Sequence, residues 1–170
     1  MPDSRRQTKR WIGANMPPAL ETPLRAVLFV SSNHEDRASL ERSVNFNWTV
    51  IASATVASAI SVLEERPLPI VICDSEIASG TWGELLERIS LFPDPPLLIV
   101  TSRLADERLW AEAINLGAWD VLAQPFDAEE AIRIVGFAWQ HWRDRHNVLI
   151  SRAQEGRLAS RTGQMAATGT

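Results

Sequence analysis

Five short apolar runs alternate with helix-like segments, and this alternation constrains the fold more than any other feature of the 170-residue chain. The runs are continuously apolar rather than alternating, which is typical of strands buried on both faces of a parallel sheet. The segment after each run supplies the crossover that parallel strands need. The pattern predicts a doubly wound α/β domain whose five strands are AVLFV (26–30), TVIA (49–52), IVIC (70–73), LLIV (97–100) and VLA (121–123).

The expected helices begin and end at recognisable residues. Ser32 and Asn33 are candidate caps before a helix over 35–44, and Gly117 is a natural end for a helix over 105–116. A last helix begins after Asp127, whose side chain caps it while Glu130, three residues on, completes a capping box. The remaining two helices are expected over 56–66 and 82–90.

The two ends of the chain lack this pattern. Residues 1–23 are basic and contain four prolines without an apolar period, so we expect a flexible tail, within which Met16 is an alternative start. Residues 147–170 are mostly small and polar and are expected to form a largely disordered extension. The folded domain is therefore predicted over 24–146.

Composition excludes several classes of function. A net charge of −4 argues against a nucleic-acid partner, and no apolar stretch is long enough to cross a membrane. Cys73 is the only cysteine, so no disulfide forms, and we expect a cytoplasmic protein. The three histidines lack the spacing of metal ligands, and no phosphate loop or nucleophile elbow is present. We therefore expect no metal site and no independent enzymatic turnover.

Polar residues follow the strands where such folds bind ligands, at the carboxyl ends of the strands. Asp74 ends the third run directly. The other residues at this edge are Ser31 and Ser32 after the first run, Thr101 and Ser102 after the fourth, and Gln124 and Pro125 after the fifth.

Three stretches together resemble the receiver domain of bacterial response regulators, over about residues 24–146. They are CDSEIASGTWGELL, LLIVTSRLADE and GAWDVLAQPFDAEE. The resemblance implies a flavodoxin-like sheet in the order 2-1-3-4-5 with five helices, and it places Asp74 at the position that accepts a phosphoryl group from a histidine kinase or a phosphotransfer protein. It also implies that Thr101 contacts the phosphoryl oxygen and that Pro125 shapes the loop after the fifth strand.

The chain departs from the family at the groups that neutralise phosphoryl charge. Ser31 and Ser32 stand where the family has an acidic pair that binds Mg²⁺, and Gln124 stands where it has a lysine. Lys9 is the only lysine of the chain, so no other lysine replaces it. Mg²⁺ binding is weakened accordingly, and Glu35 and Glu76 are candidate compensating acids. Val121 replaces the aromatic residue that the family usually has within the fifth strand.

Aromatic residues indicate a second candidate site. Trp110, Trp119 and Phe137 are expected near the fourth helix, fifth strand and fifth helix, the surface through which receivers bind partners or dimerise. Trp139 and Trp142 are expected in the core.

Two functional hypotheses follow from these observations. In the first, the chain is a stand-alone response regulator of two-component phosphorelay signalling with Asp74 as the acceptor. In the second, it is a pseudo-receiver, a binding or dimerisation module that works without phosphate. A small-ligand enzyme of flavodoxin type is disfavoured by the missing phosphate loop.

Overall fold

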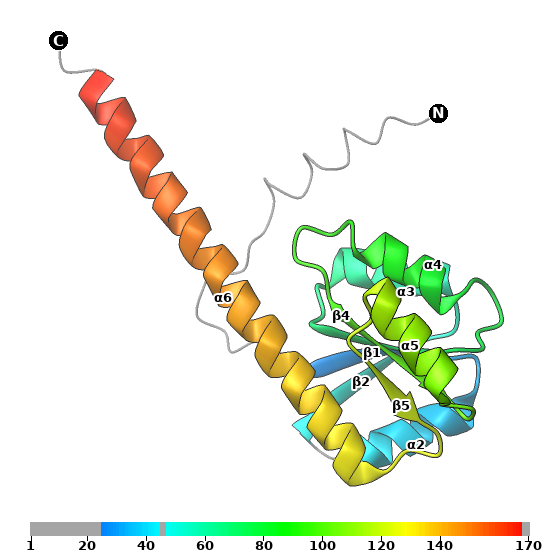
Figure 1. Cartoon of the computed structure of the whole chain (residues 1–170). Coiled ribbons are helices and arrows are strands. Elements are labelled where there is room, and N and C mark those ends of the chain that lie inside the picture. The colour runs from blue at the N-terminus through cyan, green and yellow to red at the C-terminus, as the bar shows by residue number, and fades with distance from the viewer. Residues whose placement is uncertain (1–24, 45–46, 168–170) are drawn as a thin grey trace, which may run out of the picture.

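The computed structural model describes residues 25–44 and 47–167, with side chains through residue 157. Five parallel strands form one sheet in the order β2-β1-β3-β4-β5 (Figure 1). This confirms the predicted flavodoxin-like sheet, whose strands are β1 (Ala26–Val30), β2 (Thr49–Ser53), β3 (Ile70–Asp74), β4 (Leu97–Ser102) and β5 (Asp120–Ala123). The expected tail over 1–23 lies outside the described residues.

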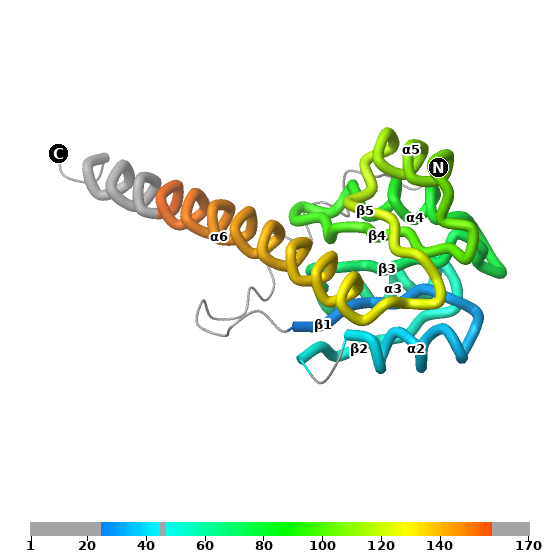
Figure 2. The backbone as a smooth tube through the Cα atoms, turned by 60° about the horizontal axis from the view of Figure 1, so that its bottom comes forward, coloured from blue at the N-terminus to red at the C-terminus, as the bar shows by residue number. Residues whose placement is uncertain are grey.

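Helices cover both faces of the sheet (Figure 2). They are α2 (His34–Val44), α3 (Val56–Glu65), α4 (Trp82–Ile89), α5 (Glu107–Leu116) and α6 (Ala128–Ala167). Successive β1 residues point to opposite faces, so Leu28 packs with α3, α4 and α5, whereas Phe29 packs with α2 and α6. Two apolar cores therefore cover the two faces of the sheet, which explains why the inner strands β1, β3 and β4 are continuously apolar up to their carboxyl ends.

Three of the predicted caps are present at helix ends. Asn33 Oδ1 accepts from the Glu35 N–H at 2.9 Å, and Asp127 Oδ1 accepts from the Glu130 N–H at 2.9 Å. Gly117 ends α5 in the left-handed conformation with φ of 105°. The two N-terminal caps fix loops at the carboxyl edge of the sheet, where the polar residues gather, whereas Gly117 precedes β5 and lies at the opposite edge.

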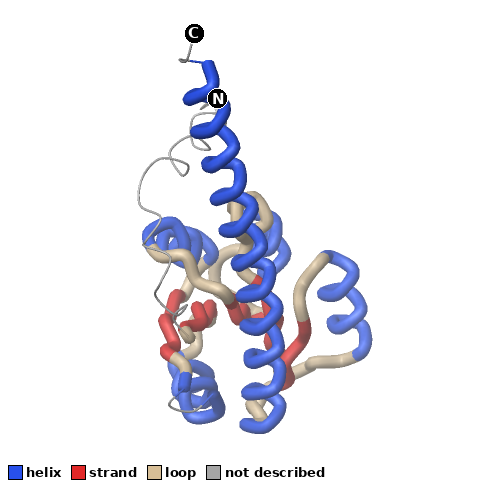
Figure 3. Tube along the Cα trace, turned by 90° about the vertical axis from the view of Figure 1, so that its left-hand side faces the viewer, coloured by secondary structure: helices blue, strands red, loops and turns tan. Residues whose placement is uncertain are grey.

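The C-terminal segment differs from expectation. Helix α6 does not end near residue 146 but continues to Ala167, and its second half projects away from the sheet (Figures 1 and 3). The described side chains from 151 to 157 are all exposed. The sequence from 147 to 167 contains no proline and is rich in alanine, arginine and glutamine, which favour helix. Small polar residues were therefore a poor indicator of disorder here.

A polar clasp fastens α6 to the loop before β4 at the point where the helix leaves the domain. Asp94 Oδ1 lies 3.2 Å from Arg145 Nη2, and Asp94 Oδ2 lies 2.5 Å from His146 Nδ1. Arg145 also donates to the Pro95 carbonyl, and the His146 ring stacks on Trp142 at 4.5 Å. These side chains are about one third exposed or less, so the pairs are less screened than surface ion pairs.

Asp94→Asn is expected to lower the free energy of unfolding by about 1–2 kcal/mol, between the values for exposed and buried charge pairs. Urea denaturation followed by tryptophan fluorescence would measure it. Asp144→Asn on α6 is the matched control, because the Asp144 side chain is 72% exposed. This control substitution should change the free energy of unfolding by less than about 0.5 kcal/mol. Equal midpoints for both variants would contradict a stabilising clasp.

Candidate functional site

Asp74 lies at the carboxyl end of β3 and is only 6% exposed. Its Oδ2 accepts from the Ser31 hydroxyl at 3.3 Å, and its Oδ1 accepts from the Glu76 N–H at 3.2 Å. Among the described residues, no cation forms an ion pair with this carboxylate. Asp74 is therefore a buried acid that only neutral groups contact.

Ser31 and Ser32 have different environments. The Ser31 Oγ bridges the site, because it donates to Asp74 and accepts from the Asn33 N–H at 3.1 Å. Ser32 is exposed. Ser31 therefore belongs to the Asp74 site, as its position after β1 predicts, and Ser32 lies at its rim.

Thr101 and Gln124 form a second polar contact at this edge of the sheet. Thr101 is paired with Asp74 in the register of β3 and β4 and is fully buried. Gln124 Nε2 donates to Thr101 Oγ1, so the amide at the expected lysine position is directed at the threonine hydroxyl. The Gln124–Pro125 peptide bond is cis. The site therefore unites Ser31, Asp74, Thr101 and Gln124 from four segments of the chain.

These residues do not fit a Mg²⁺ ion well. Mg²⁺ prefers several oxygen ligands, among them carboxylates. Of the four residues that form this site, Asp74 is the only acid, and both of its carboxylate oxygens already accept hydrogen bonds. Glu35 and Glu76, the candidate compensating acids, are both exposed. Across the described part of the chain, no group of three or more acids, histidines or cysteines is arranged to hold a metal.

An ion pair that the sequence analysis missed lies beside Gln124. Asp36 of α2 is 6% exposed, and its Oδ1 lies 2.6 Å from Arg103 Nη2. A signal was present in the sequence, because Asp36 precedes the buried Leu40 by four residues and so lies on the same face of the helix. Arg103 follows β4 directly, at the edge where ligands bind in this fold class.

Cys73 is fully buried within β3, next to Asp74. The pKa of the Cys73 thiol is raised from 9.0 to about 12. Burial is the larger cause, and the negative charge of the neighbouring Asp74 is the smaller one. The thiol is therefore neutral and inaccessible in the folded protein, as expected of a packed apolar residue.

The pKa of Cys73 predicts how stability depends on alkaline pH. The unfolded chain loses the thiol proton near pH 9, whereas the folded protein keeps it up to about pH 12. The contribution of this thiol to folding is therefore complete below pH 9 and falls as pH rises from 9 towards 12. Urea unfolding of wild type and Cys73→Ala should show a steeper alkaline loss in the wild type. Parallel pH profiles would contradict the raised pKa.

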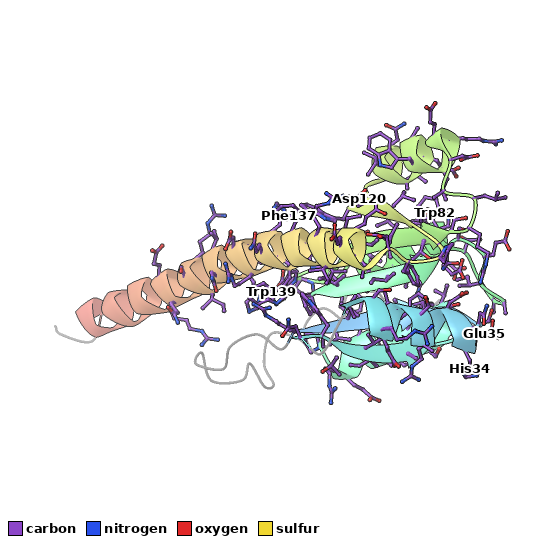
Figure 4. The ribbon with its side chains drawn as sticks, turned by 90° about the horizontal axis from the view of Figure 1, so that it is seen from below. His34, Glu35, Trp82, Asp120, Phe137 and Trp139 are labelled. Atoms are coloured by element: carbon purple, nitrogen blue, oxygen red, sulfur yellow. The ribbon has the colours of Figure 1, made fainter. Side chains whose placement is uncertain are left out.

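The predicted aromatic partner face is only partly exposed. Trp110 is 53% exposed on α5, and Phe137 is 55% exposed on α6, on a different side of the helix from the buried Trp139 (Figure 4). Trp119, just before β5, is half-buried and contacts the His141 ring at 4.8 Å. Val121 is buried in the sheet. Trp110 and Phe137 are therefore the aromatic side chains of this face that a partner can reach.

No described helix combines the length and apolar character that crossing a membrane requires. No protein-family model and no curated protein matches this chain.

Several solved structures resemble the chain closely in fold. The signal receiver domain of an HD domain-containing protein from Pseudomonas fluorescens Pf-5 has a TM-score of 0.67 and 23% identity, over 76% of this chain and 96% of that one. A putative response regulator from Chloroflexus aurantiacus J-10-fl gives 0.65 and 20%, over 70% and 99%. A CheY-like receiver domain protein from Methanospirillum hungatei JF-1 gives 0.63 and 18%, over 72% and 98%. The chain therefore has the receiver fold.

Proposed function

Because the chain has the fold of response regulator receiver domains, we propose that it is a receiver-type protein of two-component signal transduction that acts through protein–protein contacts. The observation that carries the proposal is the position of Asp74, which ends β3 in contact with Ser31 and beside Thr101. A carboxylate there can serve as a phosphoryl nucleophile towards a histidine kinase or phosphotransfer protein. The exposed Trp110 and Phe137 provide the anchors for a protein partner or a second copy.

A second candidate function is a phosphorylation-independent binding module, and the hydrogen bonds of the site favour it. Ser31 already donates to Asp74, and Gln124 already donates to Thr101. The Asp74 carboxylate and the Thr101 hydroxyl therefore each have a hydrogen-bond partner without a phosphoryl group. No cation contacts Asp74 among the described residues to offset the charge of a transferring phosphoryl group. We therefore expect acetyl phosphate to phosphorylate Asp74 of the wild-type protein only slowly.

Intact mass spectrometry separates the two candidates. The purified protein is incubated with acetyl phosphate and Mg²⁺ beside an Asp74→Asn control, and folding of both is checked by circular dichroism. A gain of one phosphoryl mass in the wild type alone supports the phosphorylated switch. No gain in the folded wild type after long incubation supports the module, whose partner binding should then survive Asp74→Asn.

A further inference from the structure

A cavity of about 230 Å³ lies next to the Asp74 site, at the same edge of the sheet. It is open to solvent on one side and is lined by the first turns of α2, the loop after β4 and the loop after β5. Asp74 does not line it, so the cavity is separate from the acceptor position although Gln124 borders both. Its lining residues are Asp36, Ser39, Arg103, Gln124, Pro125 and Phe126.

Two buried oxygen atoms in these walls lack a hydrogen-bond donor. Asp36 and Gln124 are 6% and 7% exposed. Within the described part of the chain, neither Asp36 Oδ2 nor Gln124 Oε1 has a partner. Leaving such an acceptor unpaired is costly, and for a carboxylate the cost is larger still. Since both atoms are hydrogen-bond acceptors, a ligand with several hydrogen-bond donors would satisfy them.

Arg103 covers one side of the carboxylate and leaves the other free. Its Nη2 lies 2.6 Å from Asp36 Oδ1, while its side chain is 60% exposed and able to turn outward. It is the only cation among the residues that line the cavity. Asp36 Oδ2 and Gln124 Oε1 both have almost no contact with solvent, so a ligand can reach them only when the Arg103 side chain turns outward.

We propose that this cavity binds a small molecule through a primary ammonium group, which donates to Asp36 Oδ2 and Gln124 Oε1. An ammonium ion carries three donors and a positive charge, so it satisfies both acceptors and pairs with the carboxylate. The volume is below the range of pockets for drug-sized ligands, which selects a short amine over a nucleotide or a peptide. This binding does not depend on phosphorylation of Asp74.

Nuclear magnetic resonance titration of the full ¹⁵N-labelled chain tests the proposal. Ethylammonium chloride is the probe, with sodium chloride at equal ionic strength as the reference. Saturable shifts of the Gln124 side-chain amide and of the Asp36 and Arg103 backbone signals are expected with ethylammonium alone. A parallel titration with glycine distinguishes the source of the ammonium group. If glycine binds more tightly than ethylammonium, the ligand is an amino acid; if glycine binds more weakly, the ligand is a simple amine.

Variants locate the ammonium group on Asp36. Asp36→Asn should weaken ethylammonium binding about tenfold or more, because it removes the buried counter-charge. Glu35→Gln is the matched control on the same helix turn, and since Glu35 is exposed, it should bind as the wild type does. If Asp36→Asn fails to fold, Arg103→Gln decides the question, because removing the internal competitor should strengthen binding.

Three results would overturn the proposal. The first is the absence of saturable shifts in the wild type, and the second is equal shifts with sodium chloride. The third is an unchanged affinity in folded Asp36→Asn or in Arg103→Gln, since either would place the ammonium group away from the carboxylate.

Discussion

Replacing Ser31, Ser32 and Gln124 by aspartate, aspartate and lysine should raise the rate of Asp74 phosphorylation by acetyl phosphate about a thousandfold or more. A single well-placed electrostatic contact in a transition state contributes about 10²–10³ in rate, and the triple variant restores a lysine together with carboxylates for Mg²⁺. Ser31 already donates to Asp74, so an aspartate at position 31 would lie beside that carboxylate. Time courses of intact mass for the variant and the wild type measure the gain.

Mg²⁺ should also become a stabilising ligand of this triple variant. Three neighbouring carboxylates repel one another more than the one added lysine offsets, so the melting temperature should rise with Mg²⁺ in the variant and stay constant in the wild type. Adding Asp74→Asn to the triple variant is the control, because it removes the acceptor while keeping the new charges. A folded, Mg²⁺-binding variant that is labelled no faster than the wild type would show that Asp74 lacks the geometry of an acceptor.

The architecture of this chain was predictable because β1 and the first four residues of β3 and of β4 are continuously apolar. Val27 and Phe29 face one core while Leu28 and Val30 face the other, so continuous apolarity was a direct signature of a sheet covered on both sides. The end of the last helix was not predictable in this way. The described side chains from 151 to 157 are all exposed and no apolar period marks residues 147–167, so the extension of the helix to Ala167 follows helix propensity.

The site was predictable only as far as chain position determines it. Parallel strands bring their carboxyl ends to one edge, which is sufficient to gather Ser31, Asp74, Thr101 and Gln124. Which of them contact one another was not predictable, because the hydrogen bond from Gln124 to Thr101 depends on side-chain conformation. Asp36 was overlooked because a single acid near the start of a helix is ordinarily exposed, and its burial depends on Arg103, distant in sequence.

Phe29→Ala should lower the free energy of unfolding by about 3–5 kcal/mol, the range for removing a buried aromatic ring. Phe29 is 1% exposed, and its ring meets the Phe126 ring edge-on with centroids 6.2 Å apart. Phe126 lies two residues after Gln124 in the loop that follows β5, so the loss should also shift the signal of the Gln124 side-chain amide. Urea denaturation gives the stability, and the amide spectrum reports on the site.

Phe137→Ala is the matched control, because it deletes the same ring from a side chain that is 55% exposed. In a monomer it should change stability by less than about 0.5 kcal/mol. A loss that grows with protein concentration would mean instead that a second copy covers Phe137, because association stabilises the folded state by mass action. If Phe29→Ala lowers the free energy of unfolding by less than about 1 kcal/mol, the core packing around Phe29 would be contradicted, because removing a fully buried ring destabilises a protein by more than that.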